Sequence, residues 1–111
     1  MTELKVRQKC EDMIAYGYVA LQQFPKAEKH TLAADIKRSM FRLLELVIIC
    51  NKKYYKKTTM QELDVELDVL RSYVRLAMML KFLSFHKYEV WSGYLNEIGK
   101  MIGGWLKSLK D

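Results

Sequence analysis

The sequence predicts an all-α fold, an antiparallel up-down-up-down four-helix bundle in which residues 1–111 form a single domain. In four successive segments, apolar residues recur at steps of three and four, which is the spacing of one helix face. The chain has one proline and five glycines in 111 residues, too few for a loop-rich β fold. Half of its residues are hydrophobic, enough to bury a core without disulfides or metals. Short links between consecutive helices favour antiparallel neighbours.

The first two helices are expected over residues 4–24 and 31–55. The apolar series of the first contains Val6, Cys10, Met13, Gly17, Ala20 and Phe24. It ends before Pro25, because proline disfavours a helical conformation in the residue that precedes it. Thr31 is the expected N-cap of the second helix. The apolar series of that helix contains Leu32, Ile36, Met40, Leu43, Val47, Cys50 and Tyr54.

The third helix is expected over residues 60–82, with Thr59 and Glu62 as a capping box. It carries two apolar stripes, displaced by about a third of a turn. One contains Leu63, Leu67, Leu70, Val74 and Ala77, and the other Val65, Val69, Tyr73, Leu76, Leu80 and Leu83. One bundle does not need so much apolar surface, so the second stripe predicts a homo-oligomer. Broad stripes that face a single core are the alternative.

The fourth helix, residues 85–108 with Ser84 as the N-cap, carries glycines inside its helical pattern. Gly99, Gly103 and Gly104 each cost about 1 kcal/mol relative to alanine. Such a cost suggests that the missing side chains let another backbone come close. The expected residues of helix packing or assembly are therefore Gly99, Gly103, Gly104 and Trp105. Gly104 lies about 100° round the helix from Gly103, so one face can serve the core and another a neighbouring protomer.

Catalytic and metal-binding patterns are missing from the sequence. It contains no E-x-x-H or H-E-x-x-H pair, P-loop, G-x-S-x-G or G-x-G-x-x-G. Its two histidines, His30 and His86, fall near predicted helix starts, where a solvated role is expected. Cys10 and Cys50 are expected as buried, reduced thiols. These observations predict a protein that is not an enzyme and needs no cofactor or metal.

No segment resembles a signal peptide or a membrane span, so a cytoplasmic protein without membrane contact is expected. The formal charge is +6, with nineteen Lys and Arg against thirteen Asp and Glu. Such a charge favours polyanionic partners. The candidate binding residues are Arg38, Arg42, Lys52, Lys53, Lys56, Lys57, Arg71 and Arg75. Two alternatives stay open: the lysines complement a helix dipole, and Asp68 pairs with Arg71.

Three stretches resemble a known family. They are F-P-K-A-E-K-H-T-L at Phe24–Leu32, L-R-S-Y-V-R-L-A at Leu70–Ala77 and Y-L-N-E-I-G-K-M-I-G-G-W-L-K at Tyr94–Lys107. Together they resemble the Avd proteins, the accessory variability determinants of diversity-generating retroelements. The first stretch also resembles the intervening-sequence proteins of ribosomal-RNA genes. Where those proteins carry an N-I-A-E-G-like stretch, this chain reads L-V-I-I-C-N-K-K, which favours Avd.

The Avd resemblance implies a basic bundle protomer in a ring-like homopentamer. It implies binding to the element's reverse transcriptase and to template-repeat RNA or its DNA copy, in support of mutagenic retrohoming. Arg71 and Arg75 match the family's basic positions on the third helix, so the resemblance implies that they bind a partner. The alternative function is that of an RNA-associated bundle protein related to the ribosomal-RNA intervening-sequence proteins.

Overall fold

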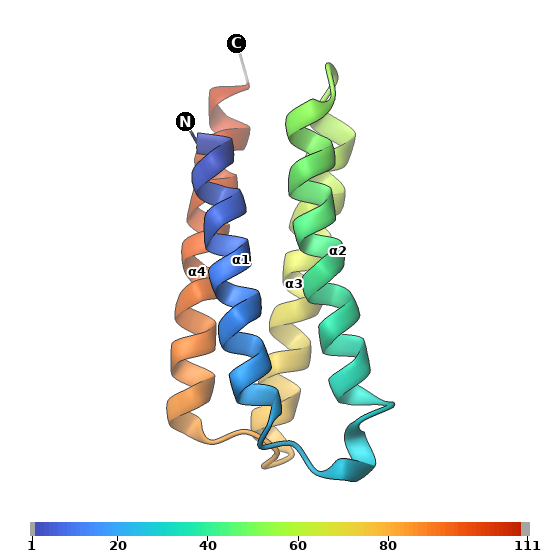
Figure 1. Ribbon diagram of the computed structural model, residues 1–111. Helices are drawn as coiled ribbons and strands as arrows, with labels where there is room; N and C mark the ends of the chain where they lie inside the picture. The colour runs from blue at the N-terminus through green and yellow to red at the C-terminus, as the bar shows by residue number, and fades with distance from the viewer. Residues whose placement is uncertain (1, 110–111) are drawn as a thin grey trace.

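Four long antiparallel helices and one short 3-10 turn make up the part of the protein that the structure describes (Figure 1). The computed structural model describes the backbone of residues 2–109 and the side chains of residues 4–109. The elements are α1 (Thr2–Leu21), η1 (Lys26–Glu28), α2 (Leu32–Lys52), α3 (Lys57–Met79) and α4 (Phe85–Ser108). The predicted fold class, a four-helix bundle without strands in the described residues, is confirmed.

Each helix packs against two neighbours. α1 contacts α2 and α4, and α3 contacts the same two helices, whereas the diagonal pairs do not meet. The molecule is elongated, with extents of 46 × 24 × 19 Å. The link between α2 and α3 lies at the same end of the bundle as the start of α1 and the end of α4 (Figure 1). The other two links lie at the opposite end.

The core is built from the predicted apolar series of α1 and α2 and the first predicted stripe of α3, together with Trp91, Leu95, Ile98, Ile102 and Trp105 of α4. The prediction for Tyr54 is wrong, because α2 ends at Lys52 and the Tyr54 side chain is 89% exposed. Trp91 is the largest side chain that is fully buried. Gly17 of α1 makes room for it, because a Cβ at this position would lie 3.0 Å from the Trp91 ring and 2.6 Å from the Met40 sulfur. Cys10 and Cys50 are buried and free. Burial raises the pKa of the Cys10 thiol to about 12, so this thiol stays protonated at neutral pH.

The helix starts follow the predicted caps only in part. Ser84 caps α4 as predicted, since its hydroxyl accepts a hydrogen bond from the Lys87 N–H at 3.2 Å. Thr31 occupies the N-cap position of α2, but its hydroxyl donates to Glu28 at 2.6 Å instead of capping. The predicted capping box of Thr59 and Glu62 is wrong. Because α3 begins at Lys57, Thr59 lies inside the first turn, where it is buried.

The first three helices each end three residues earlier than predicted, and α3 spans Lys57–Met79 where residues 60–82 were predicted. α1 ends at Leu21, so the three residues before Pro25 belong to the link. α2 ends at Lys52 because Lys56 turns back over its last carbonyls. The Lys56 amine donates to the carbonyls of Cys50, Asn51 and Lys53 at 2.7, 3.1 and 2.6 Å. This side chain closes the C-terminus of the helix, in the place where a basic residue complements the helix dipole.

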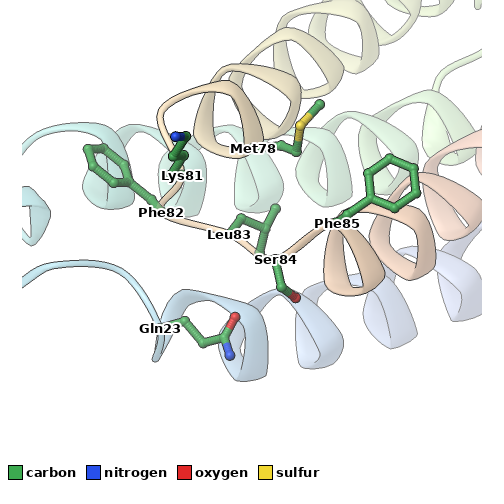
Figure 2. A pocket seen from close by; sticks show the side chains of 7 residues that line it. All are labelled: Gln23, Met78, Lys81, Phe82, Leu83, Ser84 and Phe85. Carbon is green, nitrogen blue, oxygen red and sulfur yellow. The ribbon is translucent and has the colours of Figure 1, made fainter.

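The turn from α3 to α4 is a Schellman motif that carries a lysine where glycine is usual. Lys81 has a φ of 66°, and its N–H donates to the Met78 carbonyl at 3.0 Å. The next N–H, that of Phe82, reaches back to the Ala77 carbonyl at 2.9 Å. Figure 2 shows how the chain turns here, with Phe82 and Phe85 directed to opposite sides. Phe82 packs on Phe24, with 5.8 Å between the ring centroids.

Because a left-handed backbone strains any residue with a Cβ, Lys81→Gly is expected to stabilise the protein. The expected gain in the free energy of unfolding is about 0.5–1 kcal/mol, measured by urea denaturation. The matched control is Lys81→Ala, which removes the same charge but keeps the Cβ and so gains nothing. Equal stability of the glycine and alanine variants would contradict the assigned strain.

Candidate binding surfaces

A shallow groove between α3 and α4 brings Arg71 and Arg75 together. Its volume is about 220 Å³, and the other lining residues are Ser72, Tyr88, Ser92, Leu95 and Asn96. All of these other lining residues are uncharged, so the lining of the groove carries positive charge only. A positively charged groove with hydroxyl and amide groups along one wall is suited to phosphate or carboxylate groups of a partner.

Arg71 is held in place by the bundle. Its guanidinium donates to the Leu95 carbonyl of α4 at 3.4 Å and meets Asp68 of its own helix at 3.4 Å. The side chain remains 38% exposed, while its Nε is buried without a hydrogen-bond partner. The pair with Asp68, which the sequence left open as an alternative, is therefore present. Arg71 has both a structural role and an exposed face.

Gly99 makes room for the Arg71 side chain. A Cβ at position 99 would lie 2.5 Å from Arg71 Nη2 and 3.5 Å from Leu67 Cδ2. The space that the sequence assigned to a neighbouring backbone is thus filled by a side chain of α3. Gly99 therefore belongs to the arginine groove as much as to the packing of two helices.

Arg75 is exposed and, among residues 4–109, makes no ion pair. It lies one turn after Arg71 on the same helix. The opposite wall comes from Tyr88, Ser92 and Asn96, which recur at every fourth position of α4. Sequence reasoning missed these three polar residues, although their spacing places them on one helix face.

Arg38 and Arg42 occupy a different groove, between α2 and α3, and it is acidic. Arg38 pairs with Asp35. Arg42 lies 3.5 Å from Glu45 and 3.6 Å from Glu62, which comes from α3. Glu66, also in this groove, accepts a hydrogen bond from buried Ser39 at 2.6 Å. Four carboxylates against two arginines make this surface less suited to a polyanion than the first groove.

The four lysines of the α2–α3 link do not share one role. Lys56 caps α2, whereas Lys52, Lys53 and Lys57 are exposed. The dipole alternative therefore describes Lys56 well, and the other three lysines remain available to a partner.

Apolar side chains lie on the outside of the bundle. Of the second stripe of α3, Val65, Leu76 and Leu80 are 62%, 42% and 49% exposed, and only Leu83 is buried. Further exposed apolar residues near the α3–α4 turn are Met79 and Phe85. The protomer therefore leaves apolar surface uncovered, which is typical of a surface that meets a partner.

The remaining predicted assembly residues divide into core and surface. Trp105 is buried in the core, 4% exposed. Gly103 and Gly104 are exposed, and a Cβ at either would meet nothing within 4 Å. Packing within the protomer therefore gives no reason for these two glycines.

The described residues offer neither a metal site nor a membrane-spanning helix. These residues contain no group of three or more His, Cys, Asp or Glu side chains that could hold a metal ion. None of the described helices combines the length and the apolar character that a membrane crossing requires.

The family comparison covers almost the whole chain. No curated protein matches it. A family model described as bAvd-like matches residues 4–109. The match includes all four helices, the α3–α4 arginine groove and the glycines of α4. It agrees with the resemblance to Avd proteins of diversity-generating retroelements, and the chain belongs to the bAvd-like family.

Proposed function

We propose that this protein is a non-catalytic, cytoplasmic accessory protein of a diversity-generating retroelement. It assembles into a homo-oligomer and binds the element's reverse transcriptase together with template RNA or its DNA copy. Its role is to support the copying of template-repeat RNA during mutagenic retrohoming. Family membership supports the link to the retroelement. The pentameric stoichiometry is part of the proposal and comes from the Avd resemblance.

The observation that carries the binding proposal is the α3–α4 groove. Arg75 is exposed there without an acidic partner, and Arg71 presents part of its guanidinium beside it. Arginines that border apolar surface are frequent among the residues that dominate binding energy. Arg38 and Arg42 stay predicted binding residues, but their acidic neighbours make them secondary to Arg75.

Assembly is supported by the exposed apolar residues of α3 and by the two exposed glycines of α4. An exposed helix gains nothing from glycine, since alanine in the same place stabilises it. Close packing of a neighbouring protomer against this surface explains why glycine occupies both positions 103 and 104.

Arg75→Ala is expected to weaken binding to the element's reverse transcriptase at least about tenfold, with little change in helicity or thermal stability. Arg71→Ala is expected to weaken binding and also to lower stability, because it removes the contact with the Leu95 carbonyl. The measurement is the dissociation constant by biolayer interferometry, with circular dichroism as the check on folding.

The matched control is Arg7→Ala. Arg7 is a half-exposed arginine of α1 that pairs with Glu11 at 3.7 Å, so its removal changes the net charge by the same amount. Binding by the Arg7 variant should equal that of the wild type. If the Arg7 and Arg75 variants lost the same affinity, binding would depend only on net charge. That result would contradict the assigned site.

A further inference from the structure

The α2–α3 link presents two tyrosines to solvent at the end of the bundle. Tyr54 and Tyr55 are 89% and 84% exposed, more than any other large hydrophobic residue of the described chain. Their rings meet edge to face, with 4.9 Å between the centroids. Neither ring takes part in the core, so the fold does not explain why both positions are aromatic.

The link that carries these rings is held in a fixed shape. The Lys56 amine donates to three carbonyls, those of Cys50, Asn51 and Lys53, on both sides of the end of α2. The Cys50 thiol lies 3.9 Å from the Lys56 carbonyl. These contacts fix the backbone immediately before and after the tyrosines, which reduces the entropy lost when a ligand settles on the rings.

Positive charge surrounds the rings. Between Leu46 and Gln61 the sequence contains four lysines and no acidic residue. With Lys56 engaged, Lys52, Lys53 and Lys57 remain exposed around the tyrosines. In addition, Lys107 lies in the last turn of α4, which ends at the same end of the bundle (Figure 1).

A cavity of about 480 Å³ separates the link from the end of α4. It is lined by Tyr54, Tyr55, Lys56, Lys57, Leu106 and Leu109. Apolar atoms make up most of its exposed lining, to which Lys56 and Lys57 also contribute. Flat aromatic and aliphatic surfaces with ammonium groups beside them match a chain whose bases are free to stack and whose phosphates are negative. In a duplex the base faces are already stacked on each other, so no base face is free to stack on the tyrosine rings.

We propose that the Tyr54–Tyr55 end of the bundle is a binding site for single-stranded nucleic acid. Bases stack on Tyr54 and Tyr55, and the backbone phosphates contact Lys52, Lys53 and Lys57. The proposal deepens the nucleic-acid part of the proposed function and rests on it, but it assigns a surface separate from the α3–α4 arginine groove. The single strand is recognised by its exposed bases and not by its sequence.

The test measures fluorescence anisotropy of a labelled single-stranded RNA of mixed sequence and of the matching duplex, at several salt concentrations. Tyr54→Ala with Tyr55→Ala is expected to weaken single-strand binding at least about tenfold. The slope of log affinity against log salt should stay unchanged, because no phosphate contact is lost. Binding of the duplex should also stay unchanged.

Two control variants separate stacking from charge and from damage to the fold. Tyr54→Phe with Tyr55→Phe keeps both rings and should bind like the wild type. Lys53→Gln with Lys57→Gln should reduce the salt slope by about 1.4 units, the value for two single-strand phosphate contacts. Lys56 is left intact, since its removal would release the link.

Three outcomes would overturn the site: no binding of single strands by the wild type, unchanged binding by the alanine pair, or equal loss for single strand and duplex. The same variants are tested against the reverse transcriptase, where the tyrosine pair should bind normally. The wild type could also fail to bind the reverse transcriptase while the tyrosine variants change single-strand binding as expected. That outcome would refute the proposed function and still support the single-strand site.

Discussion

Trp91→Ala is expected to lower the free energy of unfolding by about 3–5 kcal/mol, the usual cost of removing a large aromatic side chain from a core. Trp91 is fully buried, and both Gly17 and Met40 are fitted around it. The surrounding helices cannot close the cavity without moving as units, which favours the upper part of this range. Urea denaturation followed by circular dichroism measures the loss. Because domains are stabilised by only about 5–15 kcal/mol, this loss is a large fraction of the total stability and should lower the melting temperature clearly.

The matched control is Trp91→Phe. The Trp91 indole N–H is buried and has no hydrogen-bond partner in the described structure. Phenylalanine removes this polar group and keeps one aromatic ring, so part of the packing loss is offset. The phenylalanine variant should therefore lose much less stability than the alanine variant. If both variants lost a similar free energy of unfolding, the volume of the Trp91 ring system would not be the source of its stabilising effect.

Gly103→Leu is expected to abolish assembly while leaving the protomer folded. Space around Gly103 is open within the protomer, so leucine fits there without a clash. Leucine also favours the helix by about 0.8 kcal/mol relative to glycine, so helicity and thermal stability of the separated protomer should not fall. If a neighbour packs against this position, however, the larger side chain separates the two surfaces. The molar mass from light scattering should drop from that of the oligomer to that of one chain.

Gly93→Leu is the matched control for this experiment. Gly93 lies on the same helix, is exposed, and also has nothing within 4 Å of its Cβ position. It lies outside the predicted assembly motif, so its replacement should leave the molar mass unchanged. If the Gly103 variant kept the mass of the wild type, Gly103 would lie outside the interface and the glycine motif would have been misinterpreted.

The sequence predicted the fold because the bundle depends on periodicity. Apolar residues at steps of three and four identify the buried face whatever the neighbouring helix is, and the first stripe of α3 is buried as predicted. The same reasoning identified Ser84, whose cap uses a bond between residues three apart. Such local signals need no knowledge of tertiary contacts.

Features that depend on contacts between distant residues escaped the sequence. Arg42 is paired with Glu62 across two helices, twenty positions away, and no local pattern reveals that pair. Lys56 ends α2 through a side chain that folds back, which propensity does not anticipate. The sequence also could not show what fills the space beside Gly99, because that group is a side chain of another helix.

The candidate binding residues illustrate the same limit. Charge and spacing made both Arg38 with Arg42 and Arg71 with Arg75 candidates, since each pair lies one turn apart on a helix, and the Avd resemblance favoured the second pair. The structure separates them by their neighbours: both Arg38 and Arg42 pair with carboxylates, whereas in the second groove only Arg71 does, and the other lining groups there are hydroxyls, an amide and a leucine. Only the packed helices decide which basic pair keeps its charge available to a partner.

The most direct test of the central claim is cDNA synthesis in a reconstituted system. The element's reverse transcriptase is incubated with template-repeat RNA, with and without the purified protein, and the cDNA product is quantified. The protein should be required for efficient synthesis, and the Arg75→Ala variant should restore it poorly. Equal cDNA yield with and without the folded wild-type protein would contradict its role as an accessory to the reverse transcriptase.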